Sequence, residues 1–514
     1  MNVLLISPLI QECNYAGDYY ARWPQLGLAY IASTLEQKGH QVKILEKKLL
    51  SGPRYPSLKE DSERINQLIL KNIEDFRPGL IGLTATTPVI MDAYRTARVI
   101  KLVYPNTPII IGGRHVTSEP FYTLGQCQQI DIVCRGEGEI TMLELAEGLS
   151  WDKINGIIYR RGNGDFAENP DRPLVEDLDE FPYPAWHLLD EDFYFQPNIG
   201  VMRGNYMRTA TIMTSRGCPY RCAFCQSPEL LDIYGKSYIR YHSVDRVIGE
   251  IEYLRDKFKI RGISFNDDMF SLNKGRVLEI CNKVIERCIN KDIQFTVNLR
   301  SDRVDEEILY ALKEAGCIHI IYGSESGSEA TLKMMNKSLK VSENIEAIKL
   351  TKQYALVAEV NIVIGSPGET KEDFLQTIKF LKDSQPDKIF VSKFYPLPGT
   401  QFFRQLMDRK IMQKPQNWDE INDLYVENDD FTFADMEPKE FVVLRNRLIR
   451  EVVALTNFLY VIKSNLIHNP ILALSQVIKL FLYLPFLYLS QALQASLKKA
   501  VAKYSFNLRY LLRR

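Results

Sequence analysis

One stretch of the chain decides the fold: TATIMTSRGCPYRCAFC, residues 209–225. It opens with the apolar, β-branched run Thr209–Thr214, which is typical of a buried strand. Three cysteines follow within eight residues, Cys218, Cys222 and Cys225, in the spacing C-x3-C-x2-C. A buried strand that ends in a cysteine-rich loop predicts a metal centre at the carboxyl end of a sheet.

Apolar runs and helical patterns alternate after this strand. Right-handed βα repeats of this kind predict a partial (β/α)6 TIM-type barrel over residues 206–415. In such a barrel the chemistry lies at the carboxyl ends of the strands, where the cysteine loop falls. The further strands are expected at 262–265, 293–297, 318–322, 359–364 and 388–394, and the helices at 243–257, 274–288, 305–315, 342–354 and 371–383.

Residues 1–150 show a second alternation, which predicts an α/β domain with a doubly wound, Rossmann-like parallel sheet. Its strands are expected at 3–7, 41–45, 80–84, 108–112 and 130–134, with helices such as 26–38 and 91–103.

Three turns at the carboxyl ends of those N-terminal strands carry small residues, which let backbone approach a bulky ligand or a phosphate. The plain alternative is that tight turns need glycine. The first turn, residues 7–10, lacks the glycine fingerprint of dinucleotide-binding proteins, which disfavours that class of ligand. The candidate ligand residues are Thr84, Ala85, Thr86, Gly112, Gly113, Arg114, His115, Gly136 and Glu137.

Two regions flank the barrel. Residues 151–205 are predicted to be a linker, with a hairpin over 151–167 that turns at 162–164 and several prolines after it. Residues 416–514 are predicted to be a helical C-terminal region with a helix over 437–458 and a basic, apolar tail. From residue 452 to the end the chain has no Asp or Glu and eight Lys or Arg. A helical lid on the barrel, an interfacial membrane contact and a membrane span remain open for the tail.

Composition sets broad limits on the class of protein. The 514 residues are 46% hydrophobic and 25% charged, as in a globular protein. Basic and acidic residues both number 64, so net charge gives no argument for a nucleic-acid partner. Nine cysteines, an odd number, and an N-terminus without a signal-peptide pattern favour the cytoplasm. Peripheral attachment to the inner face of the membrane is the alternative that the tail leaves open.

The cysteine loop favours an iron–sulfur cluster over zinc. A structural zinc site takes four ligands, and the nearest histidine, His242, lies seventeen residues beyond Cys225 without a partner motif. Three thiolates hold a 4Fe–4S cluster and leave one iron without a protein ligand. That iron is then free to bind a substrate.

The loop resembles the cluster motif of the radical S-adenosylmethionine superfamily, including the aromatic Phe224 before the last cysteine. The resemblance implies that Cys218, Cys222 and Cys225 bind a catalytic 4Fe–4S cluster and that S-adenosylmethionine chelates the open iron. It also implies cofactor contacts at the later strand ends. As plain alternatives, the two aspartates are a helix N-cap pair and the glycines serve turns. The implied contacts are Phe224, Asn266, Asp267, Asp268, Asn298, Arg300, Glu325, Ser326, Gly365 and Gly368.

A doubly wound domain ahead of such a barrel resembles the cobalamin-binding subfamily, and the three N-terminal turns resemble its corrinoid-binding loops. The chain has no D-x-H-x-x-G motif, which in other cobalamin-binding proteins supplies the lower axial histidine. His115 lies on a different loop and is not expected to bind cobalt; its plain alternative is a loop histidine satisfied by backbone.

The resemblance implies a carbon methyltransferase. One S-adenosylmethionine methylates reduced cobalamin; a second is cleaved to a 5′-deoxyadenosyl radical, which abstracts hydrogen from an unactivated substrate carbon. That carbon then takes the methyl group from methylcobalamin. Two alternatives remain: a radical cyclase, rearrangement or coupling enzyme with the same cofactors, and a non-catalytic cobalamin or redox sensor. The expected partners are a small-molecule or lipid substrate and an electron donor such as flavodoxin or ferredoxin.

Overall fold

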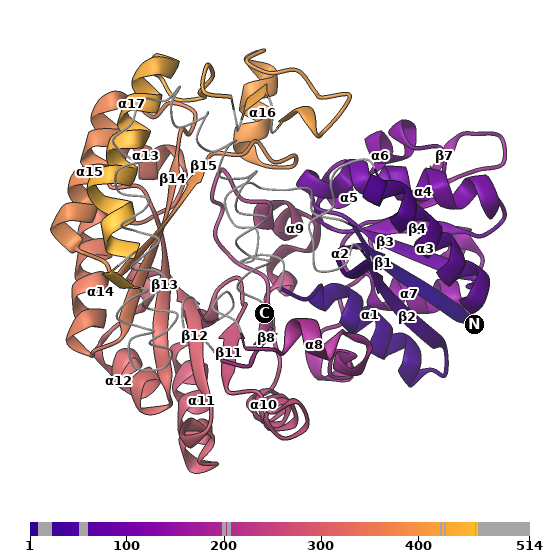
Figure 1. Ribbon diagram of the computed structural model, residues 1–514, viewed down its shortest axis with the longest axis horizontal. Coiled ribbons are helices and arrows are strands. Elements are labelled where there is room, and N and C mark those ends of the chain that lie inside the picture. The colour runs from indigo at the N-terminus through magenta and orange to yellow at the C-terminus, as the bar shows by residue number, and fades with distance from the viewer. Residues whose placement is uncertain are drawn as a thin grey trace, which may run out of the picture.

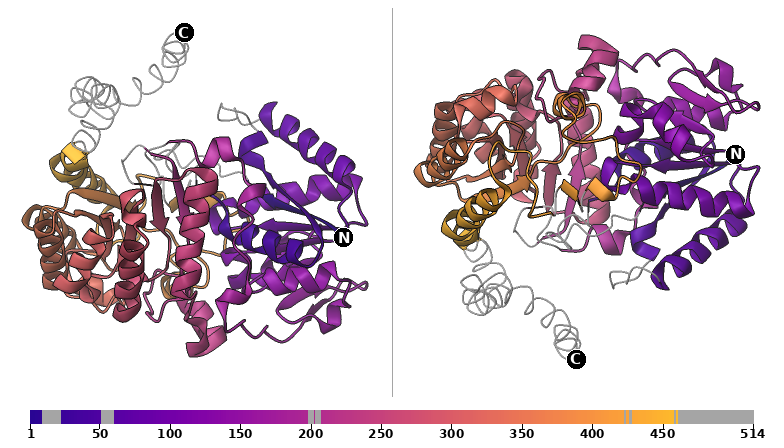
Figure 2. Two further views of the ribbon diagram at one scale, coloured as in Figure 1. Left: turned by 90° about the horizontal axis from the view of Figure 1, so that it is seen from below. Right: turned by 90° about the horizontal axis from the view of Figure 1, so that it is seen from above.

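The computed structural model describes residues 1–8, 23–50, 60–197, 202, 207–421, 424–425, 428–457 and 459–460. Within them the chain forms two units with parallel strands, which lie side by side (Figure 1). Figure 2 shows the pair from below and from above, with helix α17 (Pro438–Leu448) on the side of the barrel away from the N-terminal unit.

The N-terminal sheet has seven strands in the order β2-β1-β3-β4-β5-β6-β7. β1 to β5 are parallel, so the predicted doubly wound sheet is confirmed. The predicted hairpin is present as β6 and β7, and β6 pairs antiparallel with β5, which extends the sheet by two strands. The strands are β1 Asn2–Ser7, β2 Gln41–Glu46, β3 Leu80–Thr84, β4 Ile109–Gly112, β5 Ile132–Cys134, β6 Ile157–Arg160 and β7 Phe166–Glu168.

Helices cover both faces of this sheet, so its central strands are buried throughout. Val3, Leu4, Leu5 and Ile6 of β1 all expose 1% or less. Because β2 and β3 lie on opposite sides of β1, the strand order reverses there, and such a reversal opens a crevice at the carboxyl ends. The helices are α1 Leu26–Gln37, α2 Lys47–Leu50, α3 Glu60–Phe76, α4 Ile90–Val103, α5 Arg114–Ser118, α6 Pro120–Gln126 and α7 Glu139–Ala146.

The second unit is a six-stranded parallel sheet in the order β15-β14-β13-β12-β11-β8, which curves as a partial barrel. In the described part of the chain β8 and β15 do not pair, so the barrel is open along one side. The predicted partial (β/α)6 barrel is therefore confirmed. Its strands are β8 Thr209–Ile212, β11 Gly262–Phe265, β12 Gln294–Leu299, β13 Cys317–Glu325, β14 Val357–Ile364 and β15 Lys388–Lys393.

Helices pack against the outer face of the barrel sheet and bury a continuous apolar core. A short ribbon, β9 (Ser215–Arg216) with β10 (Arg240–Tyr241), stands between β8 and the first barrel helix. The helices are α9 Ser227–Tyr234, α10 Val244–Phe258, α11 Lys274–Glu286, α12 Glu306–Glu314, α13 Glu329–Met334, α14 Val341–Gln353, α15 Lys371–Ser384 and α16 Gln401–Asp408; α8 (Glu191–Tyr194) lies in the preceding connection.

The sequence pattern predicted a helical region after residue 416, but the described residues there are not helical throughout. The chain first returns to the N-terminal unit, where Trp418 is 1% exposed and joins the core that includes Ile109 and Ile111. The helix predicted over 437–458 is confirmed as α17, which continues into a π-helical turn, Ile449–Val453. The basic apolar tail, residues 461–514, lies outside the described residues. Among the residues described, no helix has the length and apolar character to cross a membrane.

Candidate active site between the two units

The cysteine loop is fixed to the rest of the barrel by its backbone. Ala223 is fully buried, its N–H donates to the Met335 carbonyl at 2.8 Å, and its carbonyl accepts from the Phe402 N–H at 2.9 Å. Gly217 has a φ of +97°, and an ideal Cβ there would lie 2.5 Å from the Tyr238 carbonyl oxygen, so only glycine fits. The loop therefore leaves β9 through a turn whose conformation depends on Gly217.

The three sulfurs lie in a partly enclosed environment. Burial raises the pKa of the Cys218 thiol to about 11 and also raises that of Cys222. The Ser227 N–H points at the Cys225 Sγ from 3.4 Å, which suits a thiolate. In the described residues no three His, Cys, Asp or Glu side chains converge on a single-ion site. A cluster does not require that convergence, because each thiolate binds a different iron.

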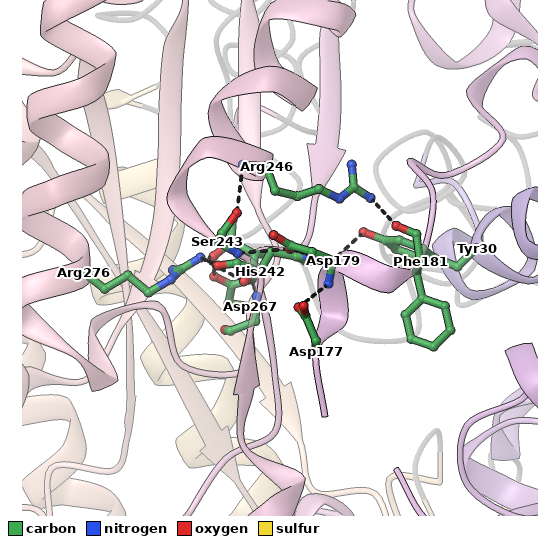
Figure 3. Close-up of polar contacts among 11 residues, drawn as sticks. Tyr30, Asp177, Asp179, Phe181, His242, Ser243, Arg246, Asp267 and Arg276 are labelled. Carbon is green, nitrogen blue, oxygen red and sulfur yellow. Dashed lines mark hydrogen bonds and ion pairs between the residues drawn. The ribbon is translucent and has the colours of Figure 1, made fainter. Parts of the chain in front are cut away.

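The adjacent aspartates at the end of β11 have different surroundings. Asp267 is 3% exposed and accepts from the N–H groups of Thr214 and Ser215, at 2.5 and 3.0 Å, and from the Thr214 hydroxyl. Figure 3 shows it beneath His242 and close to Arg276. Burial raises the pKa of Asp267 although these hydrogen bonds oppose the shift. Asp268 is exposed at the mouth of the barrel. Of the pair, Asp268 has the more accessible carboxylate, which forms one long ion pair, to Arg114 of the N-terminal unit at 3.9 Å.

Two other predicted contacts of S-adenosylmethionine are held by protein groups. Arg300 is 3% exposed and donates to the carbonyls of Lys337 and Ser338 and to Asp302. Ser326 is fully buried, and its hydroxyl lies 3.1 Å from that of Thr377. Both side chains are therefore bound by other protein groups and hold neighbouring strand ends in place.

The remaining predicted contacts lie on strand ends near the cysteine loop. Asn298, on β12, donates to the Phe265 carbonyl at 3.4 Å, and Asn266 is exposed at the mouth. Glu325 has a φ of +62°, an unusual conformation for a non-glycine residue, and pairs with Lys337 at 2.8 Å. The Lys337 ammonium lies 5.8 Å from the centre of the Phe224 ring, so it connects this strand end to the cysteine loop.

Gly365 and Gly368 shape the turn after β14, with φ of +78° and +83°. The Glu369 carboxylate closes this turn by accepting from the Gly365 N–H at 2.6 Å. Burial raises the pKa of Glu369 to about 8. The positive φ values require glycine at both positions of this turn, and its contact with a ligand stays a prediction.

A cavity of about 300 Å³ lies between the carboxyl ends of the two sheets. Both units line it, and the turns that the sequence singled out supply part of its polar lining. Six of the nine candidate N-terminal residues face it, together with Gly27 and Gly82 from other elements and six residues of the second unit. The predicted residues are Thr84, Gly112, Gly113, Arg114, Gly136 and Glu137, and the residues of the second unit are Met213, Arg216, Gly217, Leu230, Tyr238 and Asp268.

The other three N-terminal candidates do not line the cavity. His115 is fully buried, bonds the Thr87 hydroxyl at 3.1 Å and packs edge-on against Trp418. Burial, with Lys414 nearby, lowers the pKa of His115 to about 3. Ala85 acts through its backbone, which abuts Gly113, and Thr86 precedes the short helix Thr87–Val89. His115 therefore differs from the expected loop histidine satisfied by backbone: it stands on α5, its Nδ1 bonds a side chain, and its Nε2 has no hydrogen-bond partner among the described residues.

The lining residues that the sequence did not single out include three with polar side chains, Tyr30, Arg216 and Tyr238. Tyr30 lies on α1, where an aromatic residue at helical spacing looks like ordinary core. Tyr238 lies after α9, and its hydroxyl accepts from Arg114 at 3.3 Å. Only Arg216 carried a usable signal, because it stands directly before Gly217 and the first cysteine.

Two family models match the chain. The Radical SAM superfamily matches residues 212–381, and the B12 binding domain matches residues 15–146. An uncharacterized methyltransferase of Pyrococcus horikoshii is 36% identical over 399 residues, covering 77% of this chain and 81% of the relative. The anaerobic magnesium-protoporphyrin IX monomethyl ester cyclase of Rubrivivax gelatinosus is 28% identical and covers 80% and 70%.

The same arrangement of units occurs in a solved structure. The radical S-adenosylmethionine methyltransferase TsrM of Kitasatospora setae, with cobalamin and a [4Fe-4S] cluster bound, aligns with a TM-score of 0.63. The alignment covers 79% of this chain and 78% of that one at 18% identity. At this identity the likeness concerns the fold.

Proposed function

The chain belongs to the cobalamin-binding radical S-adenosylmethionine enzymes, and from this premise we propose that it methylates an unactivated carbon of its substrate. The family's cofactors are a 4Fe–4S cluster, S-adenosylmethionine and cobalamin. When bound, these groups supply one-electron bond cleavage and methyl transfer. The chain's own residues hold the groups, exclude water and set the distance between them.

The residues at the barrel mouth fit the cluster and S-adenosylmethionine. Cys218, Cys222 and Cys225 offer three thiols on one loop, and the Ser227 N–H is placed to stabilise a thiolate. Asp268 offers an unburied carboxylate to the methionine ammonium, and the Gly365–Gly368 turn offers backbone to the adenine. Asp267 and Arg300 are assigned to bracing, because protein groups occupy their polar atoms.

The N-terminal turns fit a bulky ligand that approaches the backbone closely. Gly113 has a φ of +112°, and an ideal Cβ there would lie 2.4 Å from the Ala85 carbonyl oxygen. At Gly136, with a φ of +86°, a Cβ would collide with the Tyr234 hydroxyl. The packing of these turns against Ala85 and Tyr234 thus requires glycine, and both glycines line the cavity without a side chain. One Nη atom of Arg114 is buried without a hydrogen-bond partner, so the cavity wall can still donate to a ligand.

One observation carries the proposal: a single cavity is lined by the corrinoid-type turns and by the residues around the cysteine loop. Methyl transfer to a carbon radical requires that both cofactors reach the same substrate atom. The shared cavity supports this requirement, because a substrate bound there meets the strand ends of both units.

Metal content and product analysis test the proposal. After anaerobic reconstitution with hydroxocobalamin we expect about four irons and one cobalt per chain. With a reductant and substrate we expect both S-adenosylhomocysteine and 5′-deoxyadenosine. Four irons without cobalt would overturn methylation through cobalamin, and no cleavage of S-adenosylmethionine under any reductant would favour a sensor.

A radical cyclase is the second candidate, supported by the similarity to the Rubrivivax gelatinosus cyclase. A cyclisation, rearrangement or coupling uses the same cofactors without transferring a methyl group from S-adenosylmethionine. It predicts 5′-deoxyadenosine without a matching amount of S-adenosylhomocysteine. The ratio of the two products therefore separates the candidates.

The enzyme requires a reductant and a small-molecule substrate. We propose flavodoxin or ferredoxin as the electron donor in the cytoplasm. We also propose that residues 461–514 bind the inner face of the membrane, which favours a lipid substrate; the support is their basic, acid-free composition. Co-sedimentation with phosphatidylserine vesicles, compared with a variant that ends at residue 460, tests this contact. Equal sedimentation of the two proteins would exclude it.

A further inference from the structure

The cysteine loop has a narrow neck. β9 and β10 pair antiparallel, with Arg216 opposite Arg240 and Ser215 opposite Tyr241. Residues 217–239 run between them and contain all three cysteines. Separation of the two short strands at the neck would free the base of the loop, while the Ala223 backbone still holds its middle to the barrel.

Like charges stand opposite each other at this neck. Two arginines directly across a strand pair repel, which destabilises the pair unless an anion lies between them. The anion comes from the N-terminal unit: Glu137 pairs with Arg216 at 3.0 Å and also with Arg240. Glu139 adds a second pair to Arg216 at 2.7 Å. The charges balance, and all four side chains expose 20% or less.

The rest of the neck is held by contacts with the barrel and the connecting segment. Asp267 accepts from the Thr214 and Ser215 N–H groups, and Arg276 donates to the His242 carbonyl, so both strands are held from the barrel side (Figure 3). Figure 3 also places Tyr30 and Phe181 beside this network, and the Arg216 guanidinium lies 5.1 and 5.2 Å from their ring centres. Glu137 and Glu139 differ from these supports, because they belong to the turn that lines the cobalamin cavity.

We propose that Glu137 latches the neck of the cluster loop, so that cobalamin binding and cluster binding stabilise each other. Gly136, Glu137 and Gly138 line the cavity, so a ligand there orders the turn that carries the latch. An iron–sulfur cluster orders the cysteine loop on the other side of Glu137. The group that binds first therefore lowers the entropic cost of ordering that remains for the second group. Such coupling is reciprocal. Arg216 and Arg240 act as positioning residues.

Cobalamin affinity with and without the cluster tests the latch. The inference rests on the cofactors of the proposed function and not on its reaction, so binding is measured instead of turnover. Equilibrium dialysis gives the dissociation constant of hydroxocobalamin for reconstituted and for chelator-stripped protein. For the natural sequence we expect binding at least about fivefold tighter with the cluster present.

Arg240→Gln is the informative variant, because Arg240 holds the latch without lining the cavity. We expect it to bind about four irons and to lose the affinity difference, with a ratio near one. Arg208→Gln is the control: Arg208 is a part-buried arginine that pairs with Glu191 and donates to the Phe258 carbonyl, and it belongs to neither the neck nor the cavity lining. The control should keep the ratio of the natural protein.

A second measurement needs no variant. In chelator-stripped natural protein, hydroxocobalamin should slow amide hydrogen exchange across residues 217–239. A ratio of one in the natural protein, an unchanged ratio in Arg240→Gln, or unchanged exchange would overturn the latch while leaving the two-cofactor function in place. If hydroxocobalamin does not bind in either state, the proposed function fails together with the latch.

Discussion

The two sheet edges that face each other across the cavity are built from different groups. The N-terminal edge presents glycines and backbone, such as Gly112, Gly113 and Gly136. The barrel edge presents charged side chains, such as Arg216 and Asp268, beside the start of the cysteine loop. The first suits a large neutral ring that is recognised by shape, and the second suits a zwitterion and a metal cluster. Changes at one edge should therefore act mainly on the ligand of that edge, and the two edges should affect each other only through the Glu137 contacts and the Arg114–Asp268 pair.

The largest effect is expected from loss of a thiol. Cys222→Ala leaves two protein ligands for the cluster, so we expect cluster iron and 5′-deoxyadenosine formation to fall to background. Iron analysis, electron paramagnetic resonance and chromatography of the products measure this. Cys281→Ala is the control: Cys281 is a 1% exposed cysteine on α11 that should be dispensable for iron. A Cys222→Ala protein that still cleaves S-adenosylmethionine would contradict the assignment.

A comparable loss for cobalamin is expected at the other edge. Gly113→Ala adds a Cβ 2.4 Å from the Ala85 carbonyl oxygen, in a conformation that side chains rarely adopt. Relieving the close contact and the strained backbone conformation costs about 1–3 kcal/mol and moves the turn. We expect roughly 10- to 100-fold weaker hydroxocobalamin binding, with iron content unchanged. Equilibrium dialysis and iron analysis measure the two quantities.

Gly125→Ala is the control for that substitution. Gly125 lies on α6 of the same unit, and a Cβ there would meet no atom within 4 Å. Its cobalamin affinity should equal that of the natural protein. If Gly113→Ala also retains full affinity, the N-terminal edge does not recognise its ligand through close backbone contact.

The adjacent aspartates sharpen the comparison within the barrel edge. Asp268→Asn removes a partly exposed carboxylate with one long ion pair, to Arg114, so we expect S-adenosylmethionine to bind about tenfold more weakly with little change in stability. Asp267→Asn replaces the acceptor of three hydrogen bonds, so we expect a loss of about 1–3 kcal/mol in the free energy of unfolding. Denaturant titration and equilibrium dialysis separate the two effects. Equal behaviour of the two variants would refute the division of roles.

Local sequence was sufficient for both sheets and for the cysteine loop. Strands such as 3–7 and 80–84 are predicted within one residue, because buried parallel strands are apolar along their whole length. The cavity turns were also predicted, since glycine stands where backbone must approach closely. Both signals are properties of short segments.

Whether a side chain points into the cavity depended on distant partners. Asp267 and Asp268 look equivalent in sequence, yet only Asp267 meets the N–H groups of Thr214 and Ser215, more than fifty residues away. His115 is turned away from the cavity by Trp418, which the chain brings back from beyond the barrel. The pairing of the hairpin with β5 could not be predicted either, because pairing at the edge of a sheet leaves no local pattern in the sequence.

The smallest effect on the cofactors is expected from a buried carboxyl at the junction of the units. Glu250 on α10 is 2% exposed, and its carboxyl accepts from the Trp186 indole at 3.1 Å. Burial raises the pKa of Glu250 from its ordinary 4.5 to about 7, with Arg246 opposing the shift. The contribution of Glu250 to stability is therefore fully present below pH 4.5 and is lost as the pH rises through about 7.

Glu250→Gln tests this pH dependence. Between pH 4.5 and 7 the unfolded chain releases the proton first, so the free energy of unfolding should fall by up to about 1.4 kcal/mol per pH unit on account of this group. Glutamine keeps the acceptor for Trp186 and cannot ionise, so the variant should lack this slope and gain stability at pH 7. Denaturant titrations at half-unit intervals measure it, with the exposed Glu286→Gln on α11 as the control. Iron and cobalamin content should match the natural protein, since Glu250 lies behind the cavity wall. If the free energy of unfolding of the variant falls with pH as steeply as that of the natural protein, Glu250 is ionised in the folded state. Its charge would then be compensated by Arg246.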